Sequence, residues 1–403
     1  MFKKFLQFIV LCLITLVAGE IALRYIPSNI QYPLRIQFSN TDGIGVVHPS
    51  NISVTNRSQC FNSVSYSTNK WGMHDKDRTL EKKEGVYRVA MIGDSMLDAE
   101  QVNNEEVINR LLDEKFAGKA EFLNFGMNAI GTMQANLLYE KKVRNFNPDM
   151  VLLMFYTEND IANNSVSLEA FIFNGEPFLT YRNEDGSPHS VINFNFKKEV
   201  KQFLNKNFAL FRLVREVQTK IKFKANTPQT DDVNNEDKKL SNQSEAIDLA
   251  SLRQGRGANI RTEVFIVPPD DEWEQAWMST KKELLDLKAQ VEKDGARLVV
   301  VLVPSVMEFD PRTSEFISDE VFDIIKGERS VDIMYPNKRI NEILTENNFD
   351  YIDLYPLMKE YLDENNIGYP YFSFDCNSHW STLGHEVSAD KIYNILKQEY
   401  ISI

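Results

Sequence analysis

The sequence predicts an α/β fold with a flavodoxin-like, doubly wound sheet of five parallel strands. Two observations lead to this fold class. Short apolar segments rich in β-branched residues alternate along the chain with longer segments of helical periodicity, and the connections between them are short. This alternation is typical of a doubly wound parallel sheet and unlike a sandwich or a helix bundle. Because crossovers between parallel strands are right-handed, we expect all carboxyl ends of the strands along one edge.

Five apolar segments are the predicted strands. The segment at 87–92 is too short and too β-branched for a helix, which favours a buried strand of the parallel type. The segment at 150–155 is the most apolar one after the amino terminus, so we expect it at the centre of the sheet. The remaining predicted strands are 120–124, 297–303 and 349–354.

Apolar residues at helical spacing predict the helices that cover this sheet. In residues 105–116, for example, Val107, Ile108, Leu111 and Leu112 recur on one face. The same spacing predicts helices over 133–144, 277–293, 338–347 and 384–400, and residues 196–221 also look helical.

The regular alternation divides the chain into three regions. We expect a membrane anchor or signal over 1–26, a linker and N-terminal wrap over 27–78, and the main domain over 79–403. An insertion over 161–276 interrupts the main domain. Its part from 222 to 261 is rich in Asn, Asp, Gln, Ser and Lys with few large apolar residues, a composition that predicts disorder.

The amino terminus has the pattern of an export signal. Lys3 and Lys4 precede an apolar run, which reaches the roughly 20 residues needed to span a bilayer only if Ile21-Ala22-Leu23 is counted. We therefore expect membrane contact through residues 5–23, with the main domain on the extracytoplasmic side because the lysines stay in the cytoplasm. Val17-Ala18-Gly19 also resembles a cleavage site, so secretion after cleavage is the alternative.

Composition excludes one class of partner. The formal net charge is −13, and no stripe of Lys and Arg with interleaved aromatic residues occurs, which argues against nucleic acid. Three cysteines in 403 residues do not make a disulfide framework. Cys12 lies in the apolar run, and Cys60 and Cys376 either pair in an extracytoplasmic domain or remain free thiols.

Ser95 is the candidate nucleophile. The first predicted strand ends in Gly93-Asp94-Ser95 and passes into a helical pattern. A serine there lies at the carboxyl edge of the sheet and beside the first N–H groups of a helix, where ligands bind and negative charge is stabilised. The alternative is an ordinary helix N-cap, which Asp-Ser after a strand also makes.

Two further segments end at the same predicted edge. Asn159 follows the third strand, where its amide can donate a hydrogen bond to an oxyanion, although such residues also form turns. The second strand runs into 124–132, which contains Gly126 and Ala129. Backbone N–H groups of this segment can face the same crevice, or the segment is a loop without a catalytic part.

Histidine is scarce, with five in the chain, so the position of His379 is informative. Asp375 precedes it by four residues, and such a carboxylate can orient one ring nitrogen while the other faces a nucleophile. A metal site from Asp375, His379 and His385 lacks a fourth ligand, so we expect no metal and no organic cofactor. We expect His385 to cap or pack in the last helix.

An aromatic group is open to two interpretations. Its members could line a sugar or acyl pocket, but packing in the core is the more common role of such residues. The group comprises Trp273, Trp277, Tyr335 and Trp380.

The order of these motifs resembles the SGNH (GDSL-type) hydrolase family, especially its membrane-anchored, envelope-associated bacterial members. The resemblance extends from Ser67 to about Gln398, apart from the 161–276 region. It implies the SGNH hydrolase fold, with Ser95 as nucleophile and Asp375 and His379 completing a triad. It also implies that Asn159 and a backbone N–H at Ala129 bind the oxyanion.

The chain departs from the family pattern at several positions. Ala129 stands where the family has an oxyanion glycine, and Glu158 replaces a common glycine. Asp375 and His379 are separated by more residues than usual, and His74 stands where arginine is usual. These departures concern the oxyanion site and the role of Asp375 most directly.

The resemblance and the predicted location together imply a function. We expect an extracytoplasmic, membrane-tethered serine esterase that acts on O-acyl esters, especially O-acetyl esters, of envelope carbohydrate or lipid. The same groups would serve an O-acyltransferase of a cell-surface polysaccharide if water were excluded. A catalytically inactive carbohydrate-binding or assembly subunit is the alternative from another class.

Overall fold

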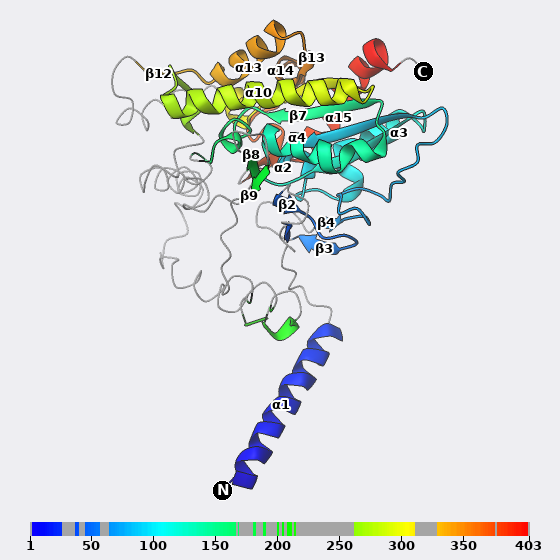
Figure 1. Ribbon diagram of the computed structural model, residues 1–403, viewed down its shortest axis with the longest axis vertical. Helices are drawn as coiled ribbons and strands as arrows, with labels where there is room; N and C mark the ends of the chain where they lie inside the picture. Colours follow the sequence, from blue (N-terminus) through cyan, green and yellow to red (C-terminus); the bar gives the residue numbers. More distant parts are fainter. Residues whose placement is uncertain are drawn as a thin grey trace.

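The computed structural model describes most of the main domain (Figure 1). The described residues are 2–25, 37–39, 45–56, 64–166, 262–310, 329–374 and 377–401, with short pieces at 168, 180–182, 188–190, 200, 204, 208–211 and 213–214. Several predictions lie outside them: parts of the linker and wrap (27–36, 40–44 and 57–63), most of the insertion including 222–261, most of the helix over 196–221, and both Cys60 and Cys376.

The sheet has five parallel strands in the order β13-β11-β7-β5-β6. In chain order the strands are β5 (Tyr87–Gly93), β6 (Ala120–Gly126), β7 (Met150–Tyr156), β11 (Arg297–Val303) and β13 (Asp350–Asp353). The second strand therefore lies at one edge and the fifth at the other, which is the flavodoxin-like order. The predicted fold class, its five strands and the central place of β7 are confirmed.

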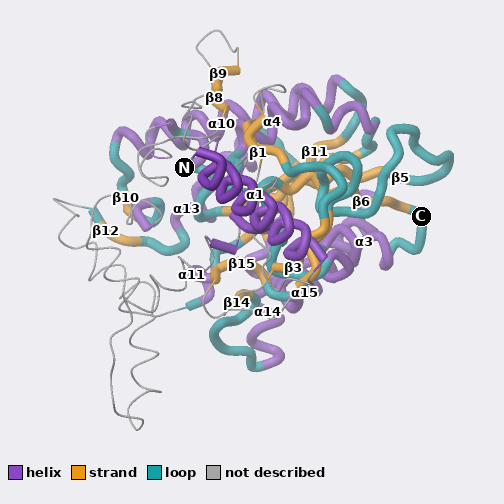
Figure 2. Tube along the Cα trace, turned by 90° about the horizontal axis from the view of Figure 1, so that it is seen from below, coloured by secondary structure: helices purple, strands orange, loops and turns teal. Residues whose placement is uncertain are grey.

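Helices cover both faces of this sheet, and Figure 2 shows α10 and α4 on the opposite side of the strands from α14 and α15. One face carries α4 (Thr132–Lys141), α10 (Asp271–Lys293) and α13 (Tyr335–Glu346). The other carries α2 (Ser95–Asp98), α3 (Ile108–Lys115), α14 (Leu354–Asn365) and α15 (Thr382–Ile395).

Alternation along the strands separates two apolar cores. In β5, Ala90 and Ile92 pack with α4 and α10, whereas Val89 and Met91 pack with α2 and α3. Successive side chains of a strand point to opposite faces, so a strand buried on both sides reads as a continuous apolar run. This is why the strands were visible in the sequence.

The helix bounds differ from the predicted ones where capping residues set them. Helix α10 begins six residues before the predicted start at Trp277, because Asp270 caps it by accepting the N–H of Trp273. Helix α14 was not predicted; Asp353 ends β13 and caps α14 by accepting the N–H of Tyr355. One residue thus closes a strand and opens a helix.

Short elements complete the described part. The 3-10 turns are η1 (Asn104–Glu106), η2 (Val143–Phe146) and η3 (Ala162–Asn164), and a π-helical turn η4 (Leu396–Tyr400) follows α15. Helix α11 (Val306–Phe309) follows β11. Antiparallel pairs are formed by β1 (Gln37–Ser39) with β2 (Gly45–Val47), β3 (Ser53–Asn56) with β4 (Val64–Ser67), β8 (Thr180–Arg182) with β9 (Pro188–Ser190), β10 (Ile266–Val267) with β12 (Ser330–Val331), and β14 (Ser373–Phe374) with β15 (Asn377–Trp380).

The amino terminus forms helix α1 (Phe2–Tyr25). Figure 1 shows it apart from the sheet and its covering helices. Within the described part of the chain, no helix combines the length and apolar character that crossing a membrane requires.

Candidate active site

The candidate site lies where the strand order reverses, between β5 and β7. Ser95 follows β5 and Asn159 follows β7, so both lie at the carboxyl edge of neighbouring strands. This is the place where open α/β sheets bind ligands. The strands approach closely here: a Cβ on Gly93 would lie 2.8 Å from the Cβ of Met154. Glycine at the end of β5 therefore permits the pairing that brings the two segments together.

Ser95 and His379 meet at this edge. The Nε2 atom of His379, on β15, lies 2.8 Å from the Oγ atom of Ser95, which begins α2. Ser95 is buried with 8% of its surface exposed, and His379 is partly buried. A hydroxyl at this distance from an imidazole nitrogen can transfer its proton as it attacks an electrophile.

Asp94 sets the start of α2. Its carboxylate accepts the backbone N–H of Met96 at 2.9 Å, and the Oγ of Ser95 lies 3.5 Å from its other oxygen. Burial raises the pKa of Asp94 to about 6, while the hydrogen bonds from Met96, Asn159 and Ser95 act against this rise. The turn that carries Ser95 is thus held by a buried carboxyl group.

Asn159 lies close to this carboxyl group. Its side-chain amide acts on Asp94 as a hydrogen-bond donor, and its Oδ1 atom is buried without a hydrogen-bond partner. An amide nitrogen carries two hydrogens, so one can face Asp94 while the other serves a second acceptor. The structure therefore places the side-chain amide of Asn159 beside the carboxyl group of Asp94.

The two candidates of the 124–132 segment take different places. Ala129 is half-buried and adopts φ = 60°, the left-handed conformation that glycine adopts without strain. Gly126 is the last residue of β6, and its N–H is already donated to the Oδ1 of Asn124 at 2.7 Å. A Cβ on Gly126 would lie 2.4 Å from the backbone nitrogen of Asp98. Gly126 therefore lets α2 approach β6, and its N–H does not point to an oxyanion.

Buried carboxyl groups line the neighbouring strand ends. Glu158 accepts hydrogen bonds from the hydroxyls of Tyr156 at 2.8 Å and Ser305 at 2.7 Å. Glu308, on α11, accepts the hydroxyl of Thr157 at 2.5 Å, and burial raises its pKa to about 8. Two hydroxyl donors thus hold the carboxyl group of Glu158, which stands where the family commonly has glycine.

Several other predicted residues have clear positions. His385 is buried, its ring packs edge-on against Trp380 at 5.6 Å between centroids, and burial lowers its pKa to about 3. It packs in the last helix, as expected. Trp273, Trp277 and Trp380 are each at most 3% exposed, so the core interpretation of these tryptophans holds. Asp375 lies outside the described residues.

A group of residues around Asp98, the last residue of α2, was not predicted from the sequence. Among the described residues, His48, Asp98 and Glu100 bring potential ligand atoms within 4.8 Å of one another. The Asp98 carboxylate is, however, engaged by the imidazole of His48 at 2.8 Å and the hydroxyl of Tyr66 at 3.2 Å. Tyr66 lies in β4 and His48 directly follows β2, both far from Ser95 in the sequence, so no spacing rule could have found them.

Solved structures of GDSL-type lipases and acetyl xylan esterases are similar to this chain. A GDSL-like lipase from Bacteroides thetaiotaomicron is 12% identical with a TM-score of 0.35, and the match covers 80% of this chain and 92% of the lipase. An acetyl xylan esterase is 15% identical with a TM-score of 0.39, covering 77% and 99%. A catalytic mutant of an acetylxylan esterase from Geobacillus stearothermophilus is 10% identical with a TM-score of 0.39, covering 79% and 97%.

No protein-family model matches the sequence. The search of curated proteins found no match.

Proposed function

We propose that this protein is an SGNH-type serine esterase that hydrolyses O-acyl esters. The observation that carries the proposal is the hydrogen-bond distance of 2.8 Å between Ser95 Oγ and His379 Nε2 at the carboxyl edge of the sheet. In acylation, Ser95 Oγ attacks the ester carbonyl while His379 takes the hydroxyl proton. The same proton then passes to the departing alcohol. Water, deprotonated by His379, releases the acid and restores Ser95.

The oxyanion that forms in each step needs donors at the same edge. We assign this role to the backbone N–H groups of Ser95 and Ala129 and to the side-chain amide of Asn159. The left-handed backbone of Ala129 supports the assignment, because the family has glycine at this position. Asp375 is assigned from the sequence alone as the carboxylate that orients His379.

The substrate class and the location rest on the resemblance and on the amino terminus. We assign an acetylated envelope carbohydrate or lipid as substrate, with the protein tethered through α1 and acting outside the cytoplasm. Supporting this, Lys3 and Lys4 precede an apolar segment in which Val10, Leu11 and Ile14 are exposed. Fractionation of cells, followed by protease treatment of intact spheroplasts, tests it. Protein that stays in the soluble cytoplasmic fraction would contradict it.

Labelling with a fluorophosphonate tests the chemistry, because this reagent reacts with an activated serine. The full-length chain in mild detergent should be labelled, whereas Ser95→Ala and His379→Ala should not. Asp375→Asn should be labelled more slowly than the wild type. A folded wild type that remains unlabelled would contradict the esterase and favour the carbohydrate-binding subunit.

The fate of the acyl group is a separate measurement. A screen of acetyl, butyryl and long-chain esters, each with and without an added oligosaccharide, gives the preferred acyl group. It also shows whether water or a sugar hydroxyl accepts that group. Release of free acid at the same rate with and without sugar is expected of the esterase. Acyl transfer to the sugar in place of hydrolysis would identify an acyltransferase.

A further inference from the structure

Helix α2 is too short to hold its own geometry. It consists of the four residues Ser95–Asp98, and Ala99 ends it in the left-handed conformation with φ = 58°. A single helical turn forms few backbone hydrogen bonds for the dihedral angles that it fixes, so its stability comes from tertiary contacts. The position of Ser95 therefore depends on whatever contacts this turn.

Three contacts from the N-terminal segment (residues 45–78) converge on Asp98, at the end of α2. The imidazole Nε2 of His48 lies 2.8 Å from one carboxylate oxygen, and the hydroxyl of Tyr66 donates to the other at 3.2 Å. The Nδ1 atom of His74 lies 2.5 Å from the backbone oxygen of Asp98. Asp98 has no exposed surface, so these partners replace water.

The same segment also contacts the end of β6, the strand that precedes Ala129. The amide of Asn124 donates to the backbone oxygens of His74 at 3.2 Å and Leu97 at 3.1 Å. Its Oδ1 accepts the N–H of Gly126 at 2.7 Å. Asn124 therefore joins the N-terminal segment, α2 and the end of β6 at one point.

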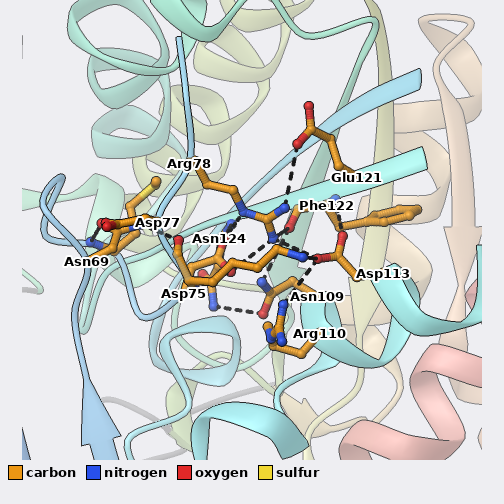
Figure 3. A network of polar contacts seen from close by, with 12 residues as sticks. Asn69, Asp75, Asp77, Arg78, Asn109, Arg110, Asp113, Glu121, Phe122 and Asn124 are labelled. Carbon is orange, nitrogen blue, oxygen red and sulfur yellow. Dashed lines mark hydrogen bonds and ion pairs between the residues drawn. The ribbon is translucent and has the colours of Figure 1, made fainter. Parts of the chain in front are cut away.

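Arg78 anchors the segment to the domain (Figure 3). Its guanidinium donates to Asp75 at 2.7 Å, to Asp113 of α3 at 3.0 Å, and to the backbone oxygen of Phe122 in β6 at 2.6 Å. Asp75 in turn accepts the N–H of Asn124 at 3.3 Å. The segment is thus tied to the sheet on one side and to Asp98 on the other.

We propose that His48 and Tyr66 are positioning residues for Ser95: by holding the Asp98 carboxylate, they fix the turn that presents the nucleophile to His379. This proposal rests on the proposed function and extends it to the N-terminal segment. Neither residue touches the reacting atoms, and both act through Asp98. The segment before the sheet is accordingly part of the working active site.

The physical consequence is a loss of rate without a loss of binding. When one donor is removed, the buried carboxylate of Asp98 keeps only part of its stabilisation and moves toward water or toward the remaining donor. The turn moves with it, and Ser95 Oγ leaves its aligned position. A displacement on the order of 1 Å at a reacting group can cost about a hundredfold in rate.

The test compares Tyr66→Phe, His48→Leu and His48→Gln in the full-length chain. The matched control is Tyr139→Phe. It removes the hydrogen bond that the buried Tyr139 donates to Asp294 at 2.9 Å, and this bond involves neither α2 nor the N-terminal segment. The readouts are kcat and KM for an aryl acetate, the fluorophosphonate labelling rate, the melting temperature, and hydrogen exchange of the amides of residues 93–99.

We expect Tyr66→Phe and His48→Leu to lower kcat and the labelling rate about tenfold or more with KM within about twofold of the wild type. His48→Gln keeps an N–H donor and should restore most of the rate. Hydrogen exchange of 93–99 should rise in the first two variants and remain unchanged in Tyr139→Phe.

Other outcomes would overturn the proposal. If Tyr66→Phe lowers the melting temperature as Tyr139→Phe does but leaves kcat and exchange of 93–99 unchanged, the contact is merely structural. If His48→Leu does not fold, Tyr66→Phe decides alone. An unlabelled wild type would refute the proposed function, and hydrogen exchange would then still show whether His48 and Tyr66 hold the turn.

Discussion

Ser95 Oγ and His379 Nε2 lie 2.8 Å apart, although 284 positions separate the two residues in the chain. The first sits on the turn after β5, and the second on β15, in the hairpin that precedes the last helix. Because the pair is already at hydrogen-bond distance, the proton of Ser95 can move without a rearrangement of either side chain. The activity of the site therefore depends on the elements that keep this distance.

The contact between Gly126 and α2 is one such element. A Cβ at position 126 would lie 2.4 Å from the nitrogen of Asp98 and 2.7 Å from the backbone carbon of Leu97, neither of which can swing away as a flexible side chain would. We expect Gly126→Ala to destabilise the fold by about 1–3 kcal/mol and to lower kcat strongly. Chemical denaturation and ester hydrolysis measure the two effects.

Gly368→Ala is the control for this substitution. No atom lies within 4 Å of the Cβ that it would add, and its φ lies outside the left-handed region. It should leave stability and kcat close to those of the wild type. Equal behaviour of the two variants would show that α2 tolerates displacement from β6.

The sequence was sufficient for most of the sheet because β5, β6, β7 and β11 are buried on both faces. Apolar runs such as Met150–Tyr156 then stand out from their surroundings, and the turn residues after them identify the carboxyl edge. That edge led to Ser95 and Asn159, whereas the scarcity of histidine led to His379. The structure brings Ser95 and His379 together and places Asn159 beside Asp94.

The contacts that hold Asp98 and the turn carrying Ser95 could not be predicted from the sequence in the same way. Asp98 looks like any acidic residue at the end of a short helix, and its partners His48 and Tyr66 lie in β segments of three and four residues or beside them. Such segments lack a periodic pattern, and their pairing depends on how the N-terminal segment folds over the domain. Gly126 belongs to the segment whose N–H groups were expected to face the crevice, but its N–H is donated to the Oδ1 of Asn124, a contact that no sequence pattern indicates.

The backbone conformation of Ala129 gives a second prediction. A left-handed conformation costs a non-glycine residue about 1–2 kcal/mol, whereas glycine adds about 0.5–1 kcal/mol of unfolded-state entropy. Ala129→Gly should therefore change stability by less than about 1 kcal/mol and keep the labelling rate, since the backbone N–H remains. Ala129→Val should lower both, because a β-branched residue is disfavoured at positive φ. If valine is labelled as fast as alanine, the N–H at 129 does not bind the oxyanion.

Glu308 predicts a fall in stability at alkaline pH. Burial raises its pKa from 4.5 to about 8, so the folded state holds a proton that the unfolded state has released. The stability from this group is present below about pH 4.5, declines as the pH rises toward 8, and is absent above it. Glu308→Gln resembles the protonated carboxyl group and should reduce the loss of melting temperature between pH 6 and pH 9.

The control for Glu308→Gln is Glu342→Gln on the exposed face of α13. It should leave the pH dependence of the melting temperature as in the wild type. A Glu308→Gln chain that loses as much stability as the wild type over this range would mean that Glu308 is ionised in the folded protein.

His48 predicts a second, separable pH dependence. Burial lowers the pKa of this imidazole, and the charge of Lys142 lowers it further. The charge and hydrogen bond of Asp98 and the charge of Glu100 raise the pKa by more than this, so the folded pKa lies above 6.5. Because the folded state binds the proton more tightly, this stabilisation is complete below about pH 6.5 and is lost as the pH rises through the folded pKa.

Tyr66 and His74 also face this group, and neither is expected to change charge between pH 7 and pH 9, since the pKa of Tyr66 is raised and that of His74 is lowered. His48→Gln should therefore be less stable than the wild type by a larger margin at pH 7 than at pH 9, measured by denaturation at both values. A margin that is equal at the two pH values would show that His48 stays neutral beside Asp98, and that the nucleophile turn is held by a neutral hydrogen bond and not by an ion pair.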